Sequence, residues 1–202
     1  MATVAPALAN TVGSGEIAPT PNIRADDPAF SGRARILVVN GTDLWDPNPQ
    51  ENTIGCINKV GKVIPVSSEC AVFEKQGPGS GYGKIVSSEG NCTFGNKLSP
   101  ANTDSYYGKE SYAWFCGLTD VKDEAWRGFL ENEQYWNITG SPTTYLGTGN
   151  LYRVFDMRAP PAGQEETFAP MDLWVFYYGG HELYGASGHI EVKMWWDRVD
   201  LE

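Results

Sequence analysis

The alternation of apolar and polar side chains is clearest near the C-terminus, in residues 189–199. Ile190, Val192, Met194 and Trp196 fall on one side of an extended chain, and this period of two predicts a half-buried β-strand. The intervening side chains are His189, Glu191, Lys193, Trp195 and Asp197. This second face would meet either bulk solvent, which is the simpler expectation, or a wet ligand cavity.

The preceding run, residues 172–178, is almost entirely apolar and aromatic, which indicates a more central strand. Together with the loop between them, the two runs carry three of the seven tryptophans and both histidines of the chain. We therefore regard residues 172–199 as the principal candidate for a recognition site.

Shorter apolar runs predict further strands along the chain. They span residues 33–40, 53–57, 62–66, 70–73, 84–88, 92–94, 111–117, 145–146 and 151–157. Residues 58–61 (Asn-Lys-Val-Gly) predict a hairpin turn. The helical spacing of Val121, Ala125, Trp126, Phe129 and Leu130 predicts one short α-helix at about 120–133. The expected fold is mainly β: an antiparallel β-sandwich or β-barrel with one short α-helix.

The chain of 202 residues is expected to form a single β domain over residues 31–200. Residues 1–30 contain few large apolar side chains and are expected to form a flexible N-terminal arm. Residues 158–170 are rich in proline and predict an exposed loop, whose length makes it a candidate lid. Residues 201–202 resemble the scar of a purification tag, so a signal peptide is expected to have been removed.

The formal net charge of −10 argues against nucleic acid and anionic membrane surfaces as partners, because both require a basic face. The sequence also lacks an apolar run of about 18 residues that would span a membrane. Neither observation determines the oligomeric state, and a homodimer is compatible with both.

Four cysteines without a Cys-x-x-Cys pair predict two disulfides in place of a zinc or redox site. Of the three pairings that four cysteines allow, Cys56–Cys70 and Cys92–Cys116 are favoured, because each would close a local β loop. Three Asn-x-Thr sequons for N-glycosylation begin at Asn40, Asn91 and Asn137. Disulfides and sequons together predict a protein of the secretory pathway, either secreted or lumenal.

The sequence offers few groups for covalent or metal catalysis. There is no Gly-x-Ser-x-Gly nucleophile motif, and His181 and His189 are the only histidines. Glu182 and Glu191 lie near them, but the spacing matches no zinc-protease or cupin signature, so hydrogen bonding is their expected role. Neither a metal nor an organic cofactor is expected. Seven tryptophans and ten tyrosines would suit a glycan-binding surface, although most of them are expected in the core.

Several segments resemble small secreted proteins of filamentous fungi. They are residues 36–45 (Ile-Leu-Val-Val-Asn-Gly-Thr-Asp-Leu-Trp), 52–62 (Asn-Thr-Ile-Gly-Cys-Ile-Asn-Lys-Val-Gly-Lys), 70–73 (Cys-Ala-Val-Phe), 90–94 (Gly-Asn-Cys-Thr-Phe) and 112–116 (Tyr-Ala-Trp-Phe-Cys). The chain also resembles one characterised branch, the hetero-Diels–Alderases of tropolone-sesquiterpenoid pathways. That resemblance implies a cofactor-free pericyclase, which joins an ortho-quinone methide made from a tropolone to a humulene-type olefin. No catalytic motif is carried over to individual residues.

A cycloaddition of this kind needs an apolar, aromatic pocket that aligns the two partners, and a hydrogen-bond donor at the quinone methide oxygen, where negative charge builds. The candidate donors are Tyr177, His189 and Arg153. The candidate substrate-binding residues are Trp174, Trp195, Trp196, Tyr178 and His181. Strand alternation places Trp195 and Trp196 on opposite faces, so both cannot face one pocket. The alternative function is a non-enzymatic secreted protein that binds glycans or acts as an effector.

Overall fold

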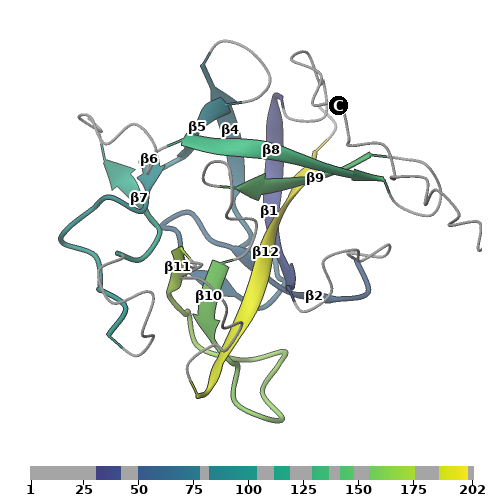
Figure 1. Ribbon diagram of the computed structural model, residues 1–202, viewed down its shortest axis with the longest axis vertical. Coiled ribbons are helices and arrows are strands. Elements are labelled where there is room, and N and C mark those ends of the chain that lie inside the picture. The colour runs from purple at the N-terminus through teal and green to yellow at the C-terminus, as the bar shows by residue number, and fades with distance from the viewer. Residues whose placement is uncertain are drawn as a thin grey trace, which may run out of the picture.

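The computed structural model describes residues 31–41, 50–77, 82–103, 112–118, 129–136, 142–147, 155–175 and 187–199. These residues form a twelve-stranded sheet, in which every strand pairing is antiparallel (Figure 1). The strands are β1 (Arg33–Asn40), β2 (Thr53–Ile57), β3 (Val63–Ile64), β4 (Val72–Gln76), β5 (Tyr82–Ser87), β6 (Gly90–Thr93), β7 (Phe115–Leu118), β8 (Phe129–Trp136), β9 (Pro142–Gly147), β10 (Phe155–Arg158), β11 (Leu173–Val175) and β12 (His189–Arg198). The predicted mainly β fold is confirmed.

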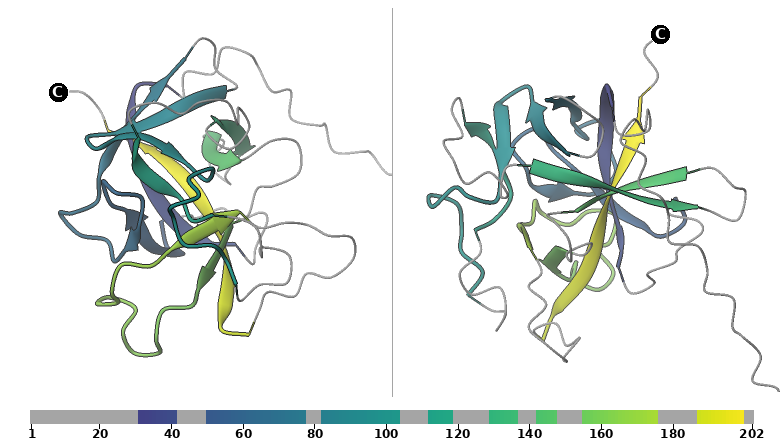
Figure 2. Two further views of the ribbon diagram at one scale, coloured as in Figure 1. Left: turned by 90° about the vertical axis from the view of Figure 1, so that its left-hand side faces the viewer. Right: turned by 45° about the horizontal axis from the view of Figure 1, so that its top comes forward.

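The sheet curls on itself around β12, its longest strand. On one side β12 pairs with β1 at seven positions, from Ala34 opposite Arg198 to Asn40 opposite Val192. On its other side it pairs with β10 and then with β9. Because β9, β8, β5, β4 and β1 follow one another in the sheet, the pairing returns to β12 and produces a barrel-like curl. Figure 2 shows β8 and β9 crossing over β1 and β12.

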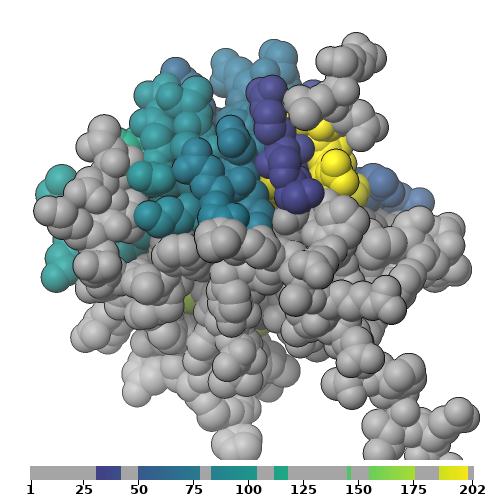
Figure 3. Space-filling view, turned by 90° about the horizontal axis from the view of Figure 1, so that it is seen from above, coloured from purple at the N-terminus to yellow at the C-terminus, as the bar shows by residue number. Residues whose placement is uncertain are grey.

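Short strands extend this curl at three places. β2 and β3 continue from β1, β10 and β11 continue from β12, and β6 and β7 continue from β5. In the space-filling view of Figure 3, β1 (purple) lies directly beside β12 (yellow). The strand predicted from the C-terminal alternation, β12, therefore lies at the centre of the fold. The run expected to be the more central strand forms β11 instead at the end of the strand order, where β10 separates it from β12.

One face of the central strands supplies the main hydrophobic core. Alternate residues of β1, β10 and β12 contribute to it, as the period of two predicted. The buried members from these strands are Ala34, Ile36, Val38, Phe155, Met157, Val192, Met194 and Trp196. Burying each large apolar side chain contributes about 1.5–3 kcal/mol, so this cluster is the main source of stability.

The α-helix expected at about 120–133 is wrong for residues 129–133. Residues from Phe129 onward form β8, which pairs with β9 at six positions and with β5 at three. Backbone pairing along both edges outweighs a helical spacing that is only a weak local preference, particularly in a segment that contains Gly128. Residues 120–128 lie outside the described part of the chain, as do the predicted arm at residues 1–30 and the predicted tag scar at 201–202.

The hairpin predicted at residues 58–61 joins β2 to β3. The backbone N–H of Asn58 donates to the carbonyl of Lys62 at 2.9 Å, and the N–H of Gly61 donates back to Asn58 at 3.0 Å. Gly61 has a φ of 95°, a conformation that other residues rarely adopt. The turn therefore requires glycine at this position.

Both predicted disulfides are present. Cys56 of β2 is bonded to Cys70, and Cys92 is bonded to Cys116, its direct cross-strand partner in the β6–β7 pair. Two disulfides are typical of secretory-pathway and extracellular proteins. Within the described segments, no helix has the length and apolar character needed to cross a membrane. Of the sequon asparagines, Asn40 is exposed, Asn91 is partly buried, and Asn137 lies outside the described residues.

Candidate functional site

The second face of β12 is covered in its middle, which corrects the simpler expectation that it meets bulk solvent. Lys193 is only 1% exposed and Trp195 only 9%. The strand register explains this burial, because Val39 of β1 lies opposite Lys193, and Tyr145 of β9 lies opposite Trp195. The Lys193 ammonium lies 5.3 Å from the centre of the Tyr145 ring, a cation–π distance.

The two adjacent tryptophans of β12 occupy different environments. Trp196 belongs to the main core, whereas Trp195 packs with Val39 and Tyr145 in a separate small cluster. The prediction that they face opposite sides is confirmed. Neither lines the pocket described below, so the structure does not bring them together with Trp174 as walls of one site.

A buried polar cluster lies further along the same face of the sheet. Asp156 of β10 is directly opposite both Glu191 of β12 and Trp174 of β11, so these three side chains share a face. His189 is the first residue of β12, and its Nδ1 atom is hydrogen-bonded to Asp156 Oδ2 at 2.9 Å. The Asn102 amide nitrogen donates to the same oxygen at 2.7 Å. Asn102 and Asp156 are 1% exposed as whole residues, and the side chains of Asp156 and His189 are each 2% exposed.

These contacts determine where the proton of His189 lies. An Asp156 oxygen that receives the Asn102 N–H still has room for a second donor, and a carboxylate is an acceptor only. The Nδ1 atom of His189 therefore carries hydrogen and donates it to Asp156. Among the described residues no donor reaches the other carboxylate oxygen, Oδ1. The arrangement matches the way in which catalytic and metal-binding histidines are oriented by a carboxylate.

Glu191 lies beside this cluster. Burial raises the pKa of the Glu191 carboxyl above its usual value, and the negative charge of Asp156 raises it further. The folded protein therefore holds this proton more tightly than the unfolded chain does. Protonated Glu191 therefore stabilises the folded protein. This contribution is fully present at pH values below the pKa of glutamate in the unfolded chain, and it is lost as the pH rises through the raised pKa of the folded protein.

Replacing Glu191 with glutamine is expected to increase the free energy of unfolding at about pH 8 by up to about 1 kcal/mol, an amount limited by solvent screening. At about pH 4, where glutamate is largely protonated, the variant and the wild type should differ little. Urea denaturation at both pH values measures the difference. The matched change Glu69→Gln, at an exposed position, should alter stability by less than about 0.5 kcal/mol at either pH. If the difference in stability between Glu191→Gln and wild type is no larger at about pH 8 than at about pH 4, the expectation is wrong.

Trp174 connects the buried cluster to the surface. Its ring lies over the imidazole of His189, with the ring centres 6.2 Å apart and the planes inclined by 30°. Its indole N–H donates to the carbonyl of Pro100 at 3.0 Å. The structure therefore brings the predicted residues Trp174 and His189 together. Trp174 also lines a pocket, so it lies between that pocket and the buried polar cluster of His189.

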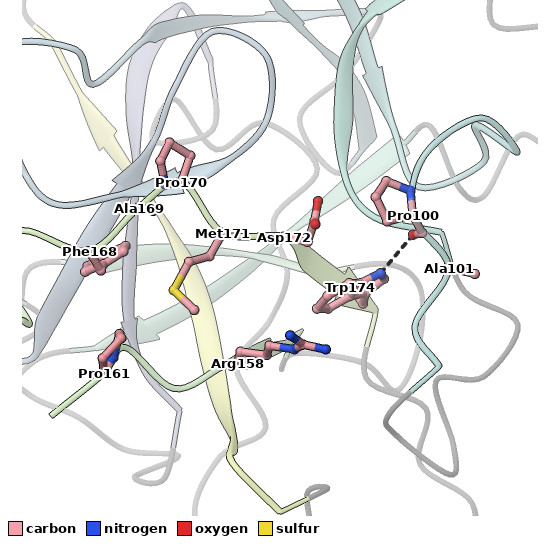
Figure 4. Close-up of a pocket in the computed structure, with 10 residues that line it drawn as sticks. All are labelled: Pro100, Ala101, Arg158, Pro161, Phe168, Ala169, Pro170, Met171, Asp172 and Trp174. Carbon is pink, nitrogen blue, oxygen red and sulfur yellow. Dashed lines mark hydrogen bonds between the residues drawn. The ribbon is translucent and has the colours of Figure 1, made fainter.

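That pocket, which we call the proline-rimmed pocket, has a volume of about 410 Å³. Its lining is mostly apolar and consists of Pro100, Ala101, Arg158, Pro161, Phe168, Ala169, Pro170, Met171, Asp172 and Trp174. Figure 4 shows the guanidinium of Arg158 between Met171 and Trp174. Arg158 is directly opposite His189 in the sheet, so the pocket and the buried cluster share the β10–β12 pair. The volume falls within the range of about 300–1,000 Å³ that is typical of small-molecule sites.

The loop of residues 159–171 forms one wall of the pocket. Most of the loop is exposed, as predicted, but Phe168 is only 3% exposed and packs in the main core. Met171 and Val63 exchange two backbone hydrogen bonds of 2.9 Å. The next residue, Asp172, forms an ion pair with Lys62. These contacts anchor the C-terminal end of the loop and pair the carboxylate of Asp172 with an ammonium group. Arg158 is the one basic residue in the lining of the pocket.

A larger groove of about 740 Å³ lies elsewhere on the surface. Glu51, Glu165 and Glu166 line it, and no described basic residue does. Its acidic lining would repel an anionic or electron-rich ligand. Among the described residues no group of three or more histidine, cysteine, aspartate or glutamate side chains is placed to hold a metal ion.

The sequence located only part of this site. Trp174 and His189 were predicted, whereas Asn102, Asp156 and Arg158 were missed. Asp156 carried a weak signal, because it is the one acidic residue in the apolar run of residues 151–157. The remaining predicted site residues, Arg153, Tyr177, Tyr178 and His181, lie outside the described part of the chain.

Comparison of the chain with protein-family models, with curated proteins and with solved structures gave no match. The site must therefore be interpreted from its own chemistry.

Proposed function

We propose that this protein binds a small, mostly apolar molecule with a flat conjugated ring in the proline-rimmed pocket. The observation that carries the proposal is the combination of apolar walls, the indole of Trp174 and the guanidinium of Arg158 in one pocket. Proline, alanine, phenylalanine and methionine side chains favour a ligand with little polar surface. The Arg158 guanidinium favours a carbonyl or ionised oxygen on that ligand, because it presents N–H donors and a permanent positive charge.

We further propose that the bound molecule undergoes a cofactor-free hetero-Diels–Alder reaction, in which a tropolone quinone methide adds to a humulene-type sesquiterpene. The resemblance to fungal hetero-Diels–Alderases suggests the reaction, and the pocket has features that it needs. Apolar walls would align the two partners, and alignment alone can lower a barrier by several kcal/mol. Arg158 would donate to the quinone methide oxygen as charge accumulates there. In this assignment Arg158 contacts the substrate, whereas His189 acts from behind Trp174.

The experiment that tests this function generates a tropolone ortho-quinone methide in the presence of humulene and follows the cycloadduct by chiral chromatography. Wild-type protein is expected to accelerate adduct formation and to favour one stereoisomer. Arg158→Gln should lower the rate by about 10- to 100-fold, because it removes the charged donor. The control Arg33→Gln removes an exposed arginine at the start of β1, and its rate should equal that of wild type.

Equal product ratios with and without wild-type protein would refute the enzymatic proposal. Binding of tropolone without acceleration would instead support a secreted binding protein without catalysis. A glycan-binding role of that kind receives little support from the aromatic residues. The four tryptophans whose side chains are described, Trp114, Trp174, Trp195 and Trp196, are at most 9% exposed, so none forms an open stacking platform.

We also propose that the protein is a fungal protein that acts in the secretory pathway, either secreted or lumenal, and that it is N-glycosylated. The two disulfides support an oxidising compartment. Asn40 is the more accessible of the two described sequon asparagines. A mobility shift after treatment of fungal-expressed protein with an N-glycosidase would support glycosylation.

A further inference from the structure

The segment of residues 99–103 contacts the site at two places. The carbonyl of Pro100 receives the indole N–H of Trp174 at 3.0 Å. Two residues later, the amide of Asn102 donates to Asp156 at 2.7 Å. Asp156 in turn bonds to His189, and the His189 ring packs against the Trp174 ring. The contacts form a closed circuit that begins and ends in one short segment.

We infer that this circuit is a clamp that fixes Trp174 as the aromatic wall of the proline-rimmed pocket, and that Asn102 is the positioning residue that ties the segment to the Asp156–His189 pair. The inference rests on the proposed ligand site. It extends that proposal by assigning ligand recognition to a residue that does not line the pocket.

The segment is itself held firmly, which a clamp requires. The Pro100 carbonyl also accepts the backbone N–H of Ala113 at 2.8 Å, and Ala101 forms a β-bridge with Tyr112. Asn102 is 1% exposed, so water competes little with its hydrogen bond to Asp156. The indole of Trp174 is thus held at its nitrogen by one end of the segment, and at its face by a histidine that the other end orients.

A purely structural role accounts less well for this choice of residues. Three polar side chains are buried together, and one oxygen of Asp156 has no donor among the described residues. Apolar residues of similar volume often stabilise such a position equally well or better. The polar circuit does provide directional bonds, which fix the orientation of a ring more closely than apolar packing does. A ring that is already fixed loses less conformational entropy when a ligand contacts it, so affinity increases.

The test compares Asn102→Ala with Asn96→Ala, each in the full chain. Asn96 lies in the same stretch of chain, and its side chain bonds only to the nearby backbone N–H of Leu98 in the described structure. The probe is 1-anilinonaphthalene-8-sulfonate, a flat apolar anion, followed by its fluorescence. Asn102→Ala is expected to weaken probe binding by about two- to tenfold, because the released indole must be ordered when the probe binds, whereas Asn96→Ala should bind like wild type.

A spectroscopic measurement separates positioning from stability. The NMR signal of the Trp174 indole N–H, assigned by its loss in Trp174→Phe, should move in Asn102→Ala and stay in place in Asn96→Ala. Asn102→Ser, which keeps a shorter hydrogen-bond donor, should give intermediate values and serves if the alanine variant does not fold. Asn102 variants that are less stable but bind the probe with wild-type affinity, or whose indole signal does not move, would overturn the inference.

The two proposals can fail separately. If wild-type protein does not bind the probe, or binds it equally well after Arg158→Gln, the proposed ligand site is refuted. The position of the indole signal still decides whether the clamp exists. If the probe binds at the pocket and the indole signal is insensitive to Asn102, the ligand site stands and the clamp is refuted.

Discussion

Replacing Asp156 with alanine is expected to lower the free energy of unfolding by about 2–5 kcal/mol. The change leaves the Asn102 amide and the His189 Nδ1–H without their shared acceptor, in a region where both Asp156 and His189 side chains are 2% exposed. Each buried donor that loses its partner costs about 1–3 kcal/mol, because water cannot replace the missing acceptor. Urea denaturation followed by far-ultraviolet circular dichroism measures the loss.

The conservative variant Asp156→Asn separates hydrogen bonding from charge. Both donors converge on Oδ2, and no described donor reaches Oδ1, so an asparagine can place its oxygen at the first position and its amide at the second. The Asp156→Asn variant should therefore keep most of the stability that the Asp156→Ala variant loses. A double-mutant cycle with His189→Ala would then assign the remaining coupling to the pair. An Asp156→Ala protein within about 0.5 kcal/mol of wild type would show that the cluster contributes nothing to folding.

The second large effect is expected from Trp114→Ala, which should lower the free energy of unfolding by about 3–5 kcal/mol. Trp114 is fully buried, and its ring centre lies 4.7 Å from that of Phe94, which in turn stacks on Phe155. Removing the indole leaves a cavity at the centre of this aromatic cluster. The effect should extend to the pocket, because the backbone N–H of Trp114 donates to Leu173, the residue before Trp174.

Two further variants test the cause of that loss. The indole N–H of Trp114 has no hydrogen-bond acceptor among the described residues, so Trp114→Phe removes an unsatisfied donor together with some volume. It should therefore cost much less than the alanine variant. Leu98→Ala, at a side chain that is 93% exposed, should change the free energy of unfolding by less than about 0.5 kcal/mol. Similar losses for Trp114→Ala and Leu98→Ala would mean that core packing around Phe94 is not the main source of stability.

The comparison of β12 with β8 shows when a local sequence pattern predicts the secondary structure. In residues 189–199 the period of two is sustained over ten residues, and the strand forms as predicted. In residues 120–133 five apolar side chains at helical spacing predicted a helix, and from Phe129 onward pairing with β5 and β9 made a strand instead. A pattern that holds at nearly every position records the local conformation reliably, whereas a sparse one is overridden by strand partners that are distant in sequence.

The sequence by itself determined the mainly β fold, the two disulfides, and the opposite facing of Trp195 and Trp196. These features depend on the alternation of side chains along a strand and on cysteines that close local loops. Only the tertiary structure decided that Lys193 is buried, that Asp156 meets His189 and Asn102, and that Arg158 lines a pocket with Trp174. Those contacts join residues that are distant in sequence: Asp156 lies 54 residues from Asn102 and 33 from His189. They depend on which strands pair and on the register between them; the alternation within one strand excludes a one-residue slip but does not specify its partner.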